Sequence, residues 1–253
     1  MDRFLAETPL LDWTHESIDA LFMERKWDGL DAAGRARVVH EFVRDEIPFG
    51  YNRREIIPAS RVLAEGMGQC NSKGTLLMAC WRRGGIPCRF HAFAVSKRVQ
   101  AGVMVEGLHD KLPGNIQHSW VEALIGETWL KLEGFIVDSA LLAGVQSRFA
   151  DWQGDFCGYA LAVDDLHHPP NEWNGGDTDI QHRAIMGDLG VFASPDEFYA
   201  EYPSNLSGPK GLLWRLLYFV PTNRNVAWLR VGNFPADAER FAGHCPPGLF
   251  PRG

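Results

Sequence analysis

Apolar residues recur at intervals of three and four positions in two stretches near the N-terminus, residues 15–25 and 31–47. This spacing places apolar side chains on one face of an amphipathic helix. The sequence therefore predicts two helices that open the fold. Their apolar faces consist of Ile18, Leu21 and Phe22 in the first stretch and of Val38, Val39, Phe42, Val43 and Ile47 in the second.

A third helical pattern begins at Cys70 and ends at the glycine pair Gly84–Gly85, after a short helical piece over residues 60–66. Glycine after the last residue of an apolar pattern is a common helix end. The apolar face of this predicted helix consists of Leu76, Leu77, Cys80 and Trp81. Cys70 is then the first residue of the helix.

The next three apolar segments have the pattern of strands rather than helices. Residues 87–95, 117–125 and 128–134 are short, rich in β-branched and aromatic residues, and separated by segments with Gly, Pro and Asn. Such segments are typical of antiparallel strands. Helices followed by a run of strands predict the α+β class, with the helices packed on an antiparallel sheet.

The character of the sequence changes at about residue 147, where Trp, Gly and Asp become dense and the patterns become irregular. We expect residues 1–146 to form the core and residues 147–253 to form a C-terminal extension packed on it, not an independent domain. Within the extension we expect helices at about residues 194–202, 209–219 and 222–231. A Pro-rich tail should follow them and be frayed.

Charge and composition narrow the function classes. The chain of 253 residues has a net charge of −7 and 45% hydrophobic residues, as in an ordinary globular protein. Without a Lys/Arg-rich block, neither nucleic acid nor a membrane surface is expected as a partner. The first residues lack the apolar run of a secretory signal, and no segment approaches the roughly 20 apolar residues of a membrane span. We therefore expect a cytoplasmic protein that acts on a peptide or a small amide or acyl compound.

Five cysteines in irregular spacing predict free thiols rather than a disulfide framework, and Cys70 differs from the others. Polar neighbours surround it, and a helix N-terminus stabilises a thiolate. His118 begins the strand pattern 48 residues later, and Glu133 ends the next one. A thiolate nucleophile needs an imidazole to move the proton and a third group to orient that imidazole. The sequence therefore predicts that Cys70, His118 and Glu133 form a set of nucleophile, imidazole and orienting group.

Four motifs in this order resemble the transglutaminase-like superfamily of papain-fold cysteine enzymes. They are Gly-Gln-Cys at residues 68–70, Gly-Ile-Pro-Cys-Arg at 85–89, His-Ser-Trp-Val-Glu at 118–122, and the strand from Trp129 to Glu133. The resemblance covers roughly residues 33–140 and implies a papain/transglutaminase-like core. It implies that Cys70 is the nucleophile and His118 the general acid and base.

Glu133 occupies the position where this family has aspartate. Asp138 is the alternative orienting residue, if the chain bends after Gly134. One oxyanion donor is the backbone N–H of Cys70, and Tyr51 and Gln69 are candidates for the second. Trp120 is interpreted mainly as a packing residue, although a tryptophan beside a nucleophile can also shape a substrate pocket.

The leading hypothesis is a cofactor-independent cysteine enzyme that acts on an amide, peptide or thioester carbonyl through a thioester acyl-enzyme. One alternative is a biosynthetic acyltransferase with a carrier-bound thioester donor, and another is a non-catalytic scaffold that binds a peptide or protein. Histidines and acids at residues 164–168 and 177–179 are interpreted as a polar loop rather than a metal site. This loop is a candidate lid over the cleft.

Overall fold

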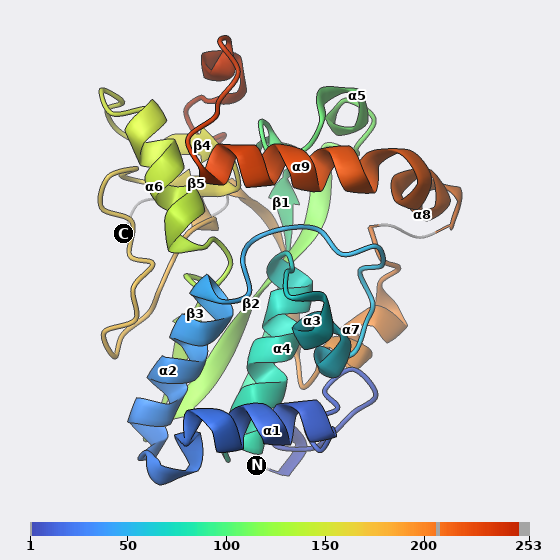
Figure 1. The fold of residues 1–253 in the computed structure, drawn as a ribbon, viewed down its shortest axis with the longest axis vertical. Coiled ribbons are helices and arrows are strands. Elements are labelled where there is room, and N and C mark those ends of the chain that lie inside the picture. The colour runs from blue at the N-terminus through green and yellow to red at the C-terminus, as the bar shows by residue number, and fades with distance from the viewer. Residues whose placement is uncertain (1, 206–207, 248–253) are drawn as a thin grey trace.

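The computed structural model describes residues 2–205 and 208–247, and its core is a four-stranded antiparallel sheet with helices on it (Figure 1). The strand order is β3-β2-β1-β6, so the strands predicted from the sequence are neighbours in the sheet. The α+β class is confirmed. The strands of this sheet are β1 (Cys88–Ser96), β2 (Asn115–Ile125), β3 (Thr128–Leu132) and β6 (Ile185–Phe192).

Helix α4 (Cys70–Arg83) packs on the sheet, and the other N-terminal helices surround it. Gly74 of α4 faces β2 so closely that an added Cβ would lie 3.4 Å from Val121. In Figure 1, α1 crosses one end of these layers and α9 crosses the other. The surrounding N-terminal helices are α1 (Glu16–Arg25), α2 (Ala32–Asp45) and α3 (Ala59–Glu65).

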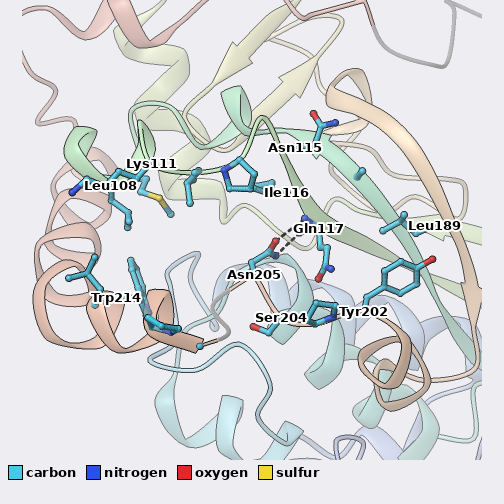
Figure 2. Close-up of a pocket in the computed structure, with 18 residues that line it drawn as sticks. Leu108, Lys111, Asn115, Ile116, Gln117, Leu189, Tyr202, Ser204, Asn205 and Trp214 are labelled. Atoms are coloured by element: carbon cyan, nitrogen blue, oxygen red, sulfur yellow. Dashed lines mark hydrogen bonds between the residues drawn. The ribbon is translucent and has the colours of Figure 1, made fainter.

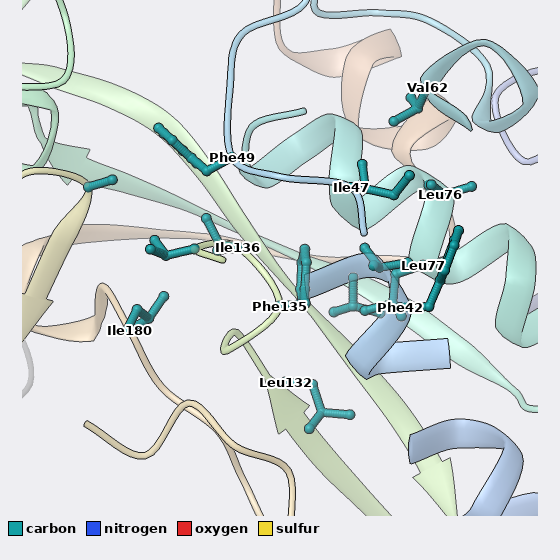
Figure 3. Close-up of a cluster of buried hydrophobic side chains, with 14 of the residues drawn as sticks. Phe42, Ile47, Phe49, Val62, Leu76, Leu77, Leu132, Phe135, Ile136 and Ile180 are labelled. Carbon is teal, nitrogen blue, oxygen red and sulfur yellow. The ribbon is translucent and has the colours of Figure 1, made fainter. Parts of the chain in front are cut away.

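The C-terminal extension is built into the core. Strand β6 pairs with β1 and forms one edge of the sheet. The remaining elements between β1 and the end of β6 are α5 (Glu106–His109), α6 (Ser139–Arg148) and the hairpin of β4 (Phe156–Gly158) and β5 (Leu161–Val163). Ile180, from the loop before β6, joins the buried cluster that also contains Phe135, Ile136 and Leu77 (Figure 3).

The helices expected at 209–219 and 222–231 form one continuous run, which corrects the prediction of a break between them. Helix α8 (Gly208–Leu213) continues through a π-helical turn, Trp214–Tyr218, into α9 (Phe219–Arg230). Pro221 lies in the first turn of α9, where it would clash with the carbonyl four residues earlier in a regular helix. The wider π turn accommodates the proline. Helix α7 (Pro195–Glu201) lies within the range predicted for it.

The C-terminal tail is not frayed over the part that the structure describes. Gly243 exchanges both backbone hydrogen bonds with Cys157, at 2.7 and 3.1 Å, so the tail extends the β4–β5 hairpin. Residues 248–253 lie outside the described residues. Over residues 2–205 and 208–247, none of the helices combines the length and the apolar character needed to cross a bilayer.

Candidate active site

Cys70 is the first residue of α4, as predicted, and its thiol is half-buried at the positive end of the helix. Gly68 lies two residues before Cys70, at a position with no space for a larger side chain. A Cβ at Gly68 would lie 2.6 Å from Ser72 Oγ and 2.9 Å from Lys73 Cγ. Gly68 also accepts a hydrogen bond from the backbone of Gly50, at 3.0 Å. The segment that carries Tyr51 is thereby fixed beside the nucleophile.

His118 lies next to Cys70 and is fully buried on β2. It is the fourth residue of the strand rather than the first, because β2 begins at Asn115. Its Nε2 lies 2.8 Å from Glu133 Oε1, so this nitrogen donates to the carboxylate and the other faces the thiol. Burial alone would lower the pKa of His118, but the Cys70 thiolate and the Glu133 carboxylate raise it to about 9. An imidazolium is therefore maintained at neutral pH.

Glu133 is completely buried directly after β3 and is held by the C-terminal extension. Its Oε2 accepts hydrogen bonds from the backbone N–H groups of Ile180 and Gln181, both at 3.0 Å. Burial would raise the pKa of Glu133, but the charge of Lys131 and the contact with His118 keep it well below its usual range. A buried carboxylate with three donors is ionised and fixed in place.

The residues that hold Glu133 could not be predicted from the sequence. The hydroxyl of Thr178 accepts hydrogen bonds from the backbone N–H groups of Glu133 and Gly134, at 3.0 and 2.9 Å. Asp177 Oδ1 accepts from the N–H of Lys131, and Asp179 pairs with the Lys131 ammonium at 3.0 Å. The signal in the sequence is the Asp-Thr-Asp run at residues 177–179, whose pattern predicts a polar loop and not these contacts.

The structure does not bring Asp138 to His118. Asp138 caps the N-terminus of α6, where its carboxylate accepts from the N–H of Leu141 at 3.0 Å and from that of Phe49 at 2.8 Å. It also pairs with the guanidinium of Arg230 at 2.9 Å. The chain has turned into a helix by residue 138, and all of these partners draw the carboxylate away from the histidine. Asp138 is thus a structural cap that ties α9 to the segment before Tyr51.

Tyr51 and Gln69 both line the pockets that contain Cys70. The Tyr51 hydroxyl is buried and has no hydrogen-bond partner among the described residues. Burial, with the charge of Cys70 nearby, raises the pKa of Tyr51, so the phenol remains neutral and able to donate. Gln69 Oε1 already accepts from the N–H of Asn52 at 3.2 Å.

Trp120 makes packing contacts instead. Its ring lies 3.8 Å from that of Phe93 between centroids, and its indole N–H donates to Glu122 at 3.2 Å. Lys131 Nζ lies over the Trp120 ring, at 4.3 Å from its centroid. These contacts fit the packing role that the sequence favoured.

Two histidines, His168 in the polar loop and His182 just after it, pair with acids of the loop. His168 contacts Asp165 at 3.0 Å, and His182 contacts Asp179 at 2.7 Å. Over the part of the chain that the structure describes, no group of three or more His, Cys, Asp or Glu side chains is arranged to hold a metal ion.

Comparison with known proteins finds one family model that is similar to part of the chain. Residues 25–134 match the model of the transglutaminase-like superfamily. Among solved structures, the chain is similar to a crystal structure described as a "putative cysteine protease" from Cytophaga hutchinsonii, with 17% identity and a TM-score of 0.40. That similarity covers 53% of this chain and only 42% of the other. No curated protein matches the chain. The segment that matches this model contains Cys70, His118 and Glu133.

Proposed function

We propose that this protein is a cysteine enzyme that attacks an amide, peptide or thioester carbonyl through Cys70 and passes the acyl group to water or to an amine. The observation that supports this function best is the buried pair of His118 and Glu133 beside the thiol, with 2.8 Å between Nε2 and Oε1. A non-catalytic scaffold has no need for a buried imidazolium or for an ionised carboxylate at this position.

The proposed reaction begins with attack of the Cys70 thiolate on the carbonyl carbon, as the π electrons of the C=O bond move to oxygen. When this tetrahedral intermediate collapses, the bond to the leaving group breaks and the His118 imidazolium protonates that group. The acyl group remains on Cys70 as a thioester. Neutral His118 then takes a proton from water or an amine, which attacks the thioester and regenerates the thiolate.

Tyr51 is the better candidate for the second oxyanion donor, because its hydroxyl is buried beside Cys70 without a partner among the described residues. Tyr51→Phe is expected to lower kcat by about 10²-fold, the effect of removing one such donor, while the ring keeps its packing. Tyr159→Phe is the matched control, since that hydroxyl donates to the carbonyl of Ala238. An unchanged kcat in Tyr51→Phe, with a large loss in Gln69→Ala, would assign the donor to Gln69.

Thiol reactivity tests the nucleophile directly. At pH 6 we expect Cys70 to be alkylated at least about tenfold faster than the other thiols, and to lose about that factor in His118→Ala, because the neighbouring cation stabilises the thiolate. Cys80 and Cys88 are internal controls, since burial raises their pKa values to about 12 and 11. Peptide mass spectrometry reads each site separately. Equal rates at Cys70 and the buried thiols would refute the assignment and favour a binding scaffold.

The pH dependence of turnover follows from His118, whose pKa is raised to about 9. The imidazolium is the proton donor to the leaving group, so activity requires the protonated form. Below about pH 9 His118 is protonated. Its titration should therefore not lower kcat/KM between pH 7 and 8. As the pH rises through about 9, the proton is lost and kcat/KM should decline tenfold per unit. A decline of kcat/KM centred near pH 6.5, the ordinary pKa of histidine, would contradict the raised pKa of His118.

A further inference from the structure

A large cavity lies directly beside the nucleophile, at the side where the C-terminal extension covers the sheet. Its volume is about 750 Å³, within the range of pockets that enclose a small-molecule ligand. Figure 2 shows Leu108 of α5, Ile116 of β2 and Trp214 of the C-terminal helices around it. Residues of the extension supply about half of the wall.

The cavity is continuous with the site of Cys70. A narrower pocket is lined by Cys70, Gln69 and Tyr51, and it shares part of its wall with the large cavity. The shared residues are Met104, Leu112, Ile116, Gln117, Asn205 and Trp214. A group bound in the cavity can therefore be joined to a carbonyl carbon at the sulfur of Cys70.

The walls of the cavity are mostly apolar, and several of the polar groups near the thiol are already bonded. The exceptions are the Tyr51 hydroxyl and the Gln117 side-chain oxygen, which are buried without a hydrogen-bond partner among the described residues. Among the described lining residues, Lys111 is the one with a charge, and it is exposed at the rim. Asn205 bonds both the N–H and the C=O of Gln117, at 3.0 and 3.1 Å (Figure 2). Its amide also donates to Glu55 at 3.0 Å. These groups offer little recognition to a polar or charged substituent, whereas the leucines and Trp214 favour an apolar one.

We propose that the acyl donor carries a large apolar group on the acyl side of its reactive carbonyl, such as an aliphatic chain of about eight carbons or a bulkier group, and that this group binds in the cavity. The inference rests on the proposed function, because it takes the attacked carbonyl to lie at Cys70. It gives the extension the role of selecting the acyl group. A series of substrates that varies the acyl group and keeps one leaving group separates this placement from one in which the cavity holds the leaving group.

The test uses p-nitrophenyl esters, from acetate to octanoate, which differ in the acyl group but share one leaving group. Each methylene that enters the cavity should raise kcat/KM by about fourfold, the factor expected for removing one CH₂ group from water. Octanoate has six more methylenes than acetate, so its kcat/KM should exceed that of acetate by about 10³-fold or more. Intact-mass spectrometry should show the corresponding acyl adduct on Cys70. The ester series is measured on the wild-type protein alone.

Leu108→Asp should reduce the ratio of octanoate to acetate kcat/KM by about tenfold or more, because the carboxylate enters the apolar wall away from Cys70. The matched control is Leu216→Asp, at a leucine that is 71% exposed and outside the cavity; it should leave the ratio at the wild-type value. If acetate acylates Cys70 but octanoate is no faster, this inference is wrong and the proposed function stands. If neither ester acylates Cys70, both are overturned.

Discussion

Replacing Cys70 by alanine is expected to lower turnover of an amide or thioester substrate by about 10⁵-fold or more, as removal of the nucleophile does in other acyl-transfer enzymes. Without the sulfur there is no covalent intermediate, and the remaining groups can only bind the substrate and polarise its carbonyl. Single-turnover release of the leaving group measures the loss. Intact-mass spectrometry should show that the acyl adduct disappears.

The variant should remain folded, because Cys70 is half-buried at the start of α4 rather than in the core. Its Tm is therefore expected to stay close to that of the wild type. Cys245→Ala is the matched control, since this half-buried thiol bonds the carbonyl of Phe156 in the extension. Wild-type turnover by the Cys70 variant, with the control equally active, would place the chemistry elsewhere.

The elements with a regular apolar period could be predicted from the sequence, and the irregular ones could not. Helix α4 is buried over nearly its whole length, but its apolar residues Leu76, Leu77, Cys80 and Trp81 still recur at helical spacing and a glycine pair marks its end. Strand β6 lacks such a pattern because it contains Gly187 and Gly190 and its register against β1 is interrupted. Its pairing depends on the position of β1, about 90 residues earlier, and no local signal reveals it. The predicted loop-rich extension therefore omitted a strand of the main sheet.

The site shows the same division between local and long-range information. Cys70 and His118 belong to local motifs, so their positions could be predicted. The resemblance implies an aspartate at residue 133, where this chain has glutamate. The sequence therefore leaves the orienting residue open between Glu133 and Asp138. The structure brings Glu133 to His118 because the 178–181 segment binds both its backbone and its carboxylate. Those contacts join residues 45 to 48 positions apart, which only the folded chain brings together.

The substitution Glu133→Gln isolates the role of this carboxylate as a positioning group that acts through His118. We expect kcat to fall by about 10³- to 10⁴-fold, as when the acid of a serine-protease triad is replaced by its amide. The N–H groups of His118, Ile180 and Gln181 all point at the carboxylate. An amide has one oxygen for these three donors, and its NH₂ must face at least one of them. The imidazolium also loses a neighbouring negative charge.

The loss of charge gives a readout that separates positioning from damage to the fold. Because the Glu133 carboxylate helps to raise the pKa of His118 to about 9, its removal should move the alkaline limb of kcat/KM to lower pH. The pH profile of Glu133→Gln, compared with that of the wild type, measures this shift. Glu133→Asp is the matched control: it keeps the charge but shortens the reach, so it should lose activity while keeping the limb nearer to pH 9. If Glu133→Gln keeps more than about a tenth of the wild-type kcat and the same alkaline limb, the contact between His118 and Glu133 is structural.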